Sequence, residues 1–167
     1  MAIQQQDSRQ LSTGAFTSEG PLDAVGWRIL TELQDNARLS FSELGRRVGM
    51  TPPAVAERVR RLEDAGIISG YRLDLNVEKL GLPLLAFVRL AVRGASAIEI
   101  GAAVGEMPEV LECHHITGED CYILKVAVAS VHHLEGMLER LVRFGNTTTS
   151  IVISSPVTRR TIAPRNH

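Results

Sequence analysis

The feature that most constrains the fold of this chain is a pair of prolines at the start of a helical pattern, in the stretch MTPPAVAERVRRLEDAG of residues 50–66. Proline is tolerated in the first turn of a helix, because the amide hydrogens of that turn have no partner inside the helix. Val55, Val59 and Leu62 recur at helical spacing and predict one buried stripe. Thr51 is expected to cap the start of the helix, and Gly66 is expected to end it. The stretch therefore predicts a helix that begins abruptly after a short turn.

Two more helices are predicted before this one. Asp23 can cap the first, whose apolar side chains follow helical spacing up to Leu33. The sequence SFSE at residues 40–43 has the Ser-x-x-Glu pattern of a capping box and opens the second, which Gly49 should end. Since the turn that follows is short, residues 40–65 predict a helix-turn-helix, a motif that places its second helix in the major groove of DNA.

Positive charge is concentrated in this motif. Five arginines and one acid lie between Arg46 and Arg61, although the whole chain has a net charge of −1. We expect the front of the third helix to approach base edges and the arginines to contact mostly phosphates. Alternatively, Glu57 and Arg61, four residues apart, form a surface ion pair. The residues predicted to contact DNA are Ser40, Arg46, Arg47, Thr51, Pro52, Pro53, Ala54, Glu57, Arg58, Arg60 and Arg61.

The second half of the chain changes from helical to alternating apolar spacing. Its order is β-α-β-β-α-β, the ferredoxin-like pattern of an antiparallel sheet with two helices on one face, so the whole chain is predicted to be α+β. The other face of such a sheet needs a cover, which predicts a homodimer. The predicted strands are residues 85–93, 109–117, 121–128 and 147–154, and the predicted helices begin at Ser96 and Ser130. The predicted regions are a disordered tail (1–20), a DNA-binding domain (21–70), a hinge strand or linker (71–82) and a ferredoxin-like ligand-binding and oligomerisation domain (83–167).

Composition sets further bounds. The chain has two cysteines, which is too few for a disulfide scaffold, and it has neither a signal-peptide pattern nor an apolar run long enough to span a membrane. A cytoplasmic location is therefore expected. No Cys-x₂-Cys or His-x₃-His spacing is present, and the neighbours His114 and His115 point to opposite faces of a strand. Neither a metal nor a cofactor is predicted.

Three stretches carry a resemblance to a known family: RVRRLEDAGII at residues 58–68, TGEDCYILKVAV at 117–128 and TTTSIVISSPV at 147–157. Together with the helix-turn-helix pattern, they make residues 21–162 resemble the Lrp/AsnC, or feast/famine, transcription regulators. This resemblance implies a winged helix-turn-helix, a hinge strand and a ferredoxin-like effector domain. It also implies dimers that assemble into tetramers or octamers on double-stranded DNA, with an amino acid or related metabolite as effector.

The resemblance also implies an effector site in the loop after residue 116 and on the last strand. Backbone N–H groups near Gly118 could hold a carboxylate, and Glu119 or Asp120 an ammonium. The family usually has aspartate where Cys121 stands, so which residue holds the ammonium stays open, and a plain hairpin is the alternative to a site. The candidate effector residues are Thr117, Gly118, Glu119, Asp120, Cys121, Tyr122, Thr148, Thr149 and Ser150.

Two other functions share this scaffold. Related sirohaem decarboxylases act on a tetrapyrrole with histidine and arginine side chains, for which His114, His115, Arg89 and Arg93 are available here. The arginine-bearing third helix and the lack of a convergent catalytic set favour a regulator, so we expect no enzyme. An architectural chromatin protein without an effector is the remaining alternative.

Overall fold

The structure, a computed structural model, describes residues 20, 22–118 and 122–164. The chain divides into two compact units, which are described separately. The helical unit is Met1–Arg72 together with Arg159–His167, and the sheet unit is Leu73–Thr158.

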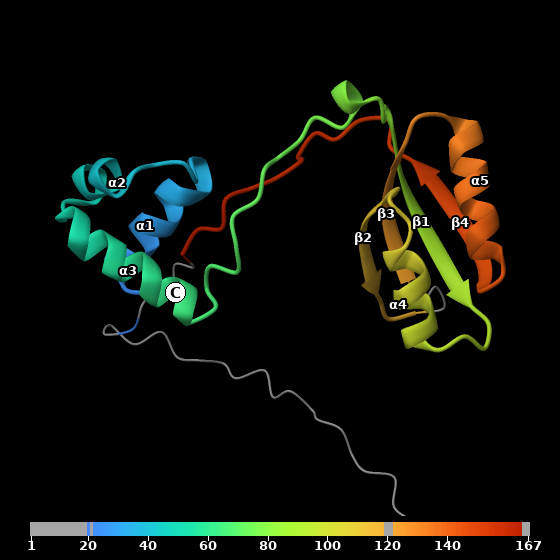
Figure 1. The fold of residues 1–167 in the computed structure, drawn as a ribbon, viewed down its shortest axis with the longest axis horizontal. Helices are drawn as coiled ribbons and strands as arrows, with labels where there is room; N and C mark the ends of the chain where they lie inside the picture. Colours follow the sequence, from blue (N-terminus) through green and yellow to red (C-terminus); the bar gives the residue numbers. More distant parts are fainter. Residues whose placement is uncertain (1–19, 21, 119–121, 165–167) are drawn as a thin grey trace, which may run out of the picture. The chain divides into compact units, whose positions relative to one another are not determined.

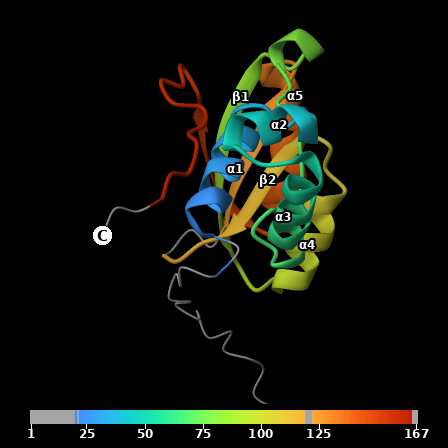
Figure 2. The ribbon, with the colours of Figure 1, turned by 90° about the vertical axis from the view of Figure 1, so that its left-hand side faces the viewer.

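The described residues of the helical unit form three helices, α1 (Ala24–Asp35), α2 (Phe41–Val48) and α3 (Pro52–Asp64). Figure 2 shows α1 alongside α2 and α3. Their apolar stripes meet in one small core, as the helical spacing predicts. The fully or nearly fully buried side chains of this core are Ile29, Leu44, Val48, Val55, Val59 and Leu62.

The sheet unit is an antiparallel four-stranded sheet, within the described residues, with strand order β2-β3-β1-β4. The two α-helices of this unit, α4 (Ala97–Gly105) and α5 (Val131–Val142), pack on one face of the sheet and share a single apolar core with it (Figure 1). This is the predicted ferredoxin-like order. The elements are β1 (Leu84–Val92), α4 (Ala97–Gly105), β2 (Val110–His115), β3 (Tyr122–Val128), α5 (Val131–Val142) and β4 (Gly145–Ile151).

The alternation of side chains along β1 separates the two faces of the sheet. Ala86, Val88 and Leu90 are fully buried under the helices, whereas Phe87 between them is 39% exposed on the other face. The two helices begin at the predicted serines: Ser96 forms a complete capping box with Glu99, and the Ser130 hydroxyl accepts the amide of His133. No helix covers the face that carries Phe87, within the described part of this unit.

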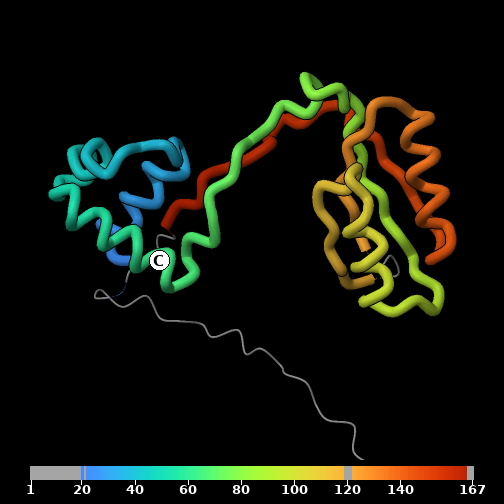
Figure 3. The backbone as a smooth tube through the Cα atoms, viewed as in Figure 1, coloured from blue at the N-terminus to red at the C-terminus, as the bar shows by residue number. Residues whose placement is uncertain are grey.

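Three details of the predicted organisation differ from the structure. Residues 69–76 run extended in Figure 3 but form no strand, and the 3-10 helix η1 (Glu78–Leu80) follows, so the predicted hinge strand is a linker. No β-wing is present in the described residues of the helical unit, which are helical or irregular. Residues from Arg159 onward group with the helical unit, not with the predicted domain 83–167, because the side chain of Gln34 binds the backbone of Ile162. No described helix is long and apolar enough to cross a membrane.

Candidate nucleic-acid interface

The turn between α2 and α3 depends on two glycines. Gly49 has a φ of 75°, in the left-handed region that glycine adopts without a steric penalty. The Met50 amide donates to the Gly45 carbonyl at 2.9 Å, and a methyl group on Gly45 would lie only 2.5 Å from the Met50 carbonyl oxygen. Sequence analysis missed Gly45, although a lone glycine inside a helical pattern signals a close approach. Both glycines fix the angle at which α3 leaves the turn.

The front of α3 is open to solvent, since its apolar stripe faces the core. Thr51, Pro52 and Pro53 are exposed and Ala54 is half-buried. Thr51 occupies the predicted cap position, but its hydroxyl makes no capping bond. One physical reason is that Pro53, at the second helical position, has no N–H to donate. The first turn of α3 therefore presents short side chains and an uncommitted hydroxyl.

Glu57 is paired with two arginines on the outer side of α3. Arg60 contacts Glu57 at 2.8 Å and Asp64 at 3.4 Å, and Arg61 contacts Glu57 at 3.0 Å. Hydrogen bonds from Arg60, and then from Arg61, lower the pKa of Glu57 below its ordinary value. The surface ion pairs that sequence spacing allowed are thus formed, and Glu57 is a carboxylate at neutral pH.

The two arginines of α2 are paired as well. Glu43 binds Arg46 at 2.7 Å and Arg47 at 2.9 Å, and Arg47 also reaches Glu32 of α1 at 2.8 Å. The hydrogen bonds from Arg46 and Arg47 lower the pKa of Glu43 to about 2. The Ser40 hydroxyl accepts the Glu43 amide at 3.2 Å. Only half of the predicted capping box forms, because the Glu43 carboxylate is engaged by the arginines.

Arg58 has a different environment from the other arginines of α3. Its guanidinium lies 2.7 Å from Asp23, in a pair whose side chains are 29% and 22% exposed. Asp23 also caps α1, since its other oxygen accepts the Gly26 amide at 2.7 Å. The Gly26 amide and then Arg58 lower the pKa of Asp23 against the opposing effect of burial. Arg58 therefore ties α3 to the start of α1, which disfavours its predicted contact with a base edge.

These pairs change the charge balance that the sequence suggested. The excess of arginine between residues 46 and 61 is offset by acidic residues, most of which lie outside these sixteen residues. These acids are Asp23, Glu32, Glu43, Glu57 and Asp64. Between residues 22 and 72 the chain has eight arginines and seven acidic residues. All five arginines of the predicted DNA surface contact a carboxylate. The surface is a set of mostly exposed ion pairs rather than a patch of free positive charge.

The candidate effector loop lies between β2 and β3. Thr117 and Gly118 are exposed, and Gly118 has a φ of 115°, which favours glycine. Tyr122 is buried and its ring stacks on His115 at 4.7 Å. Glu119, Asp120 and Cys121, which were also predicted for this site, lie outside the described residues.

The three predicted hydroxyls of β4 do not point to one side. Thr148 is opposite Arg89 and Ser150 is opposite Phe87, on the face without helices. Thr149 is opposite the buried Val88, so it points toward the helices. Of the three candidate residues, only Thr148 and Ser150 therefore share a face of the sheet. In addition, β1 lies between β4 and β3, the strand that follows the loop.

The residues considered for an enzyme do not converge. His114 is on the helix-free face, and its Nε2 lies 3.5 Å from Glu112, whereas His115 stacks on Tyr122. Arg89 is two strands from His114 in the same row across the sheet. Among described residues, no three His, Cys, Asp or Glu side chains come together in a way that could hold a metal ion.

Comparison with protein families matches both units. Residues 22–63 match the AsnC-type helix-turn-helix domain, and residues 85–162 match the Lrp/AsnC ligand binding domain. The HTH-type transcriptional regulator LrpC of Bacillus subtilis is 35% identical over 133 residues, which are 80% of this chain and 92% of that protein. The leucine-responsive regulatory protein of Escherichia coli is 39% identical over 142 residues, 81% of this chain and 87% of that protein.

Solved structures of similar proteins agree with this match. B. subtilis LrpC superposes with a TM-score of 0.79 at 35% identity, covering 83% of this chain and 99% of that one. A Neisseria meningitidis transcriptional regulator in complex with L-methionine gives 0.78 at 31% identity, covering 84% and 96%. The feast or famine regulatory protein of Mycobacterium tuberculosis, complexed with L-methionine, gives 0.79 at 34% identity, covering 86% and 99%.

Proposed function

Because this chain belongs to the Lrp/AsnC family of transcriptional regulators, and not to an enzyme family, we propose that α3 reads operator DNA in the major groove. The observation that carries this proposal is the exposed first turn of α3, which the glycines of the preceding turn hold away from the core. Pro53 and Ala54 are short enough to contact a thymine methyl, and Glu57 can accept from cytosine. Thr51 and Ser40 lie at helix starts, where phosphate contacts are favourable.

The paired arginines can exchange a carboxylate for a phosphate. Arg60 and Arg61 are 63% and 64% exposed, so each can leave Glu57 without exposing a buried charge. The same holds for Arg46 on α2. We assign phosphate contacts to Arg46, Arg47, Arg60 and Arg61, and we assign Arg58 the role of positioning α3.

This proposal is tested by selecting preferred sequences from random duplexes and then measuring affinity against salt. If a dimer neutralises about six phosphates, log K should fall with log salt at a slope of roughly −5. Arg60→Gln should reduce the slope by about 2, because a dimer carries the substitution twice, whereas Lys79→Gln, an exposed change of the same charge in the sheet unit, should not. Affinity that does not depend on salt would exclude the assignment. Binding without sequence preference would instead favour an architectural protein.

An amino acid is the effector that we propose, on the basis of the L-methionine complexes of the two similar regulators. Thr117, Gly118 and Thr148 are exposed and can contribute hydrogen bonds, and Tyr122, which follows the loop in the sequence, is buried. Glu119 and Asp120 supply candidate partners for the ammonium by their sequence position alone. The ligand is expected to change DNA affinity by about 1–3 kcal/mol.

Calorimetry with the twenty amino acids, in the presence and absence of operator DNA, tests whether an amino acid is the effector. Thr148→Val should weaken the binding of the active amino acid, and Thr149→Val is the matched control, since Thr149 points to the other face of the sheet. Equal effects of both variants would exclude β4 as part of the site. A lack of heat and of any change in DNA affinity with all twenty would exclude an amino-acid effector.

We also propose that the helix-free face of the sheet forms a homodimer, and that dimers assemble into tetramers or octamers in the cytoplasm. Phe87 is an exposed apolar side chain of this face. About 800 Å² per partner would be typical for such an interface. Light scattering should show smaller particles for Phe87→Lys than for Val131→Lys, which alters an exposed apolar residue of α5. Unchanged particle size for Phe87→Lys would exclude this face.

A further inference from the structure

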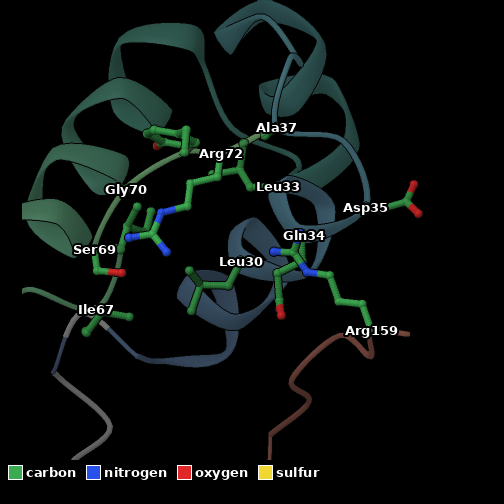
Figure 4. Close-up of a pocket in the computed structure, with 12 residues that line it drawn as sticks. Leu30, Leu33, Gln34, Asp35, Ala37, Ile67, Ser69, Gly70, Arg72 and Arg159 are labelled. Carbon is green, nitrogen blue, oxygen red and sulfur yellow. The ribbon is translucent and has the colours of Figure 1, made fainter. Parts of the chain in front are cut away.

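The helical unit contains a cavity on the side of α1 that faces the segment after α3. Its volume is about 340 Å³, and all its lining residues belong to the helical unit. Leu30, Leu33 and Ile67 supply apolar surface, and Arg72 and Arg159 supply two guanidinium groups (Figure 4). This size is at the lower end of the range for small-molecule sites.

The two arginines of the cavity differ from those of the DNA surface. Among described residues, neither Arg72 nor Arg159 makes a side-chain hydrogen bond or ion pair, whereas the arginines of α2 and α3 are all paired. Figure 4 shows their guanidinium groups on the two sides of Leu30. Two positive groups at one apolar surface are electrostatically complementary to an anion with an apolar body.

The C-terminal segment that carries Arg159 is attached to α1 by an independent contact. The side-chain amide of Gln34 donates to the Ile162 carbonyl at 3.0 Å and accepts the Ile162 amide at 2.7 Å. This pair of bonds mimics one rung of a β-ladder. The wall formed by Arg159 is therefore held in place without a ligand.

We propose that this cavity binds an amphipathic monocarboxylate, a site distinct from the effector loop. The carboxylate lies between Arg72 and Arg159, and the hydrocarbon part covers Leu30, Leu33 and Ile67. The carboxylate group of Asp35 points away from the other labelled side chains in Figure 4. Although Asp35 also lines the cavity, its carboxylate points away from the two guanidinium groups, so these groups would repel an ammonium and the ligand lacks an amino group.

The probe for this site is octanoate, added to the full-length chain and followed by calorimetry. We expect saturable binding with one octanoate per chain. Octan-1-ol and octylammonium have the same hydrocarbon length without the negative charge, and they should bind at least about tenfold more weakly. Equal binding of the three compounds, or no saturable binding of octanoate, would overturn the proposal.

Variants locate the site. Arg72→Gln and Arg159→Gln should each weaken octanoate binding about tenfold, with the melting temperature measured to show that each variant is folded. Arg160→Gln is the matched control, because Arg160 is exposed next to Arg159 and does not line the cavity. Loss of binding in the control, or full binding in both cavity variants, would place octanoate elsewhere. The amino-acid titration involves residues of the other unit, so either proposal can fail without the other.

Discussion

One ion-pair cluster of the helical unit and one of the sheet unit differ in how far they are exposed to solvent. On α3, Glu57 is 43% exposed and its partners Arg60 and Arg61 more so. In the sheet unit, the Glu109 side chain is only 10% exposed, and it binds Arg140 and His133. Exposed pairs contribute little to folding and are easily exchanged, whereas a buried carboxylate needs its partners. The difference separates a surface that can rearrange on DNA from a cluster that fixes α5 against the sheet.

The largest effect is expected at Glu109. Glu109→Gln removes the charge that faces Arg140, and it should lower the free energy of unfolding by about 2 kcal/mol. The figure is below that for a fully buried pair, because Arg140 is 43% exposed. Denaturant unfolding measures this loss, with Glu135→Gln, which changes an exposed carboxylate of α5, as the control. A loss under about 0.5 kcal/mol would remove the contrast between the two units.

The Glu109 effect should also depend on pH. Hydrogen bonding from Arg140, the largest cause, and from His133 lowers the pKa of Glu109 to about 2, from an ordinary value of 4.5. A lowered pKa adds stability above the unfolded-state pKa, and this stability is lost as pH falls through the folded value. The difference in stability between wild type and Glu109→Gln should therefore be constant above about pH 5 and shrink toward pH 2. A constant difference down to pH 2 would contradict this pairing.

An intermediate effect is expected for the half-buried pair of Asp23 and Arg58. Asp23→Asn keeps an oxygen that can cap α1 but removes the charge next to Arg58, so a loss of about 1 kcal/mol is expected. Asp35→Asn, at the exposed end of α1, is the control and should change stability by less than about 0.5 kcal/mol. Thermal unfolding of both variants would show whether the effect exceeds that of an exposed charge.

The parts of the fold that depend on local sequence were predictable. Capping residues and helical spacing located the helices, because each signal lies within a few residues of its effect. The carboxylates that bind Arg47 and Arg58 from α1 are 15 and 35 residues away in sequence, and spacing along one helix does not reveal them. The excess of positive charge that was counted between residues 46 and 61 therefore left out these two carboxylates.

The candidate site in the sheet unit was harder to predict for a different reason. The hydroxyls of β4 are adjacent in sequence, but a strand turns alternate side chains to opposite faces, so Thr149 is separated from Thr148. The linker shows a similar limit. Tyr71, Leu73 and Leu75 alternate as a strand does, yet they are exposed and have no ladder partner within the described chain. A strand requires a neighbour as well as a pattern.

The smallest effect on stability, and the most informative for function, is expected for Glu57→Gln. Since its ion pairs are exposed, the free energy of unfolding should hardly change. Freed of the carboxylate, Arg60 and Arg61 should bind a random-sequence duplex about threefold more tightly at low salt, because a charge that repels phosphate is lost. If Glu57 also accepts from a base, discrimination between operator and random DNA should fall in the same variant. Fluorescence anisotropy with both duplexes measures the two effects, and Glu139→Gln in the sheet unit controls for net charge. An unchanged affinity for the random duplex would mean that Arg60 and Arg61 do not contact phosphate, and the contrast between exchangeable and fixed pairs would then fail.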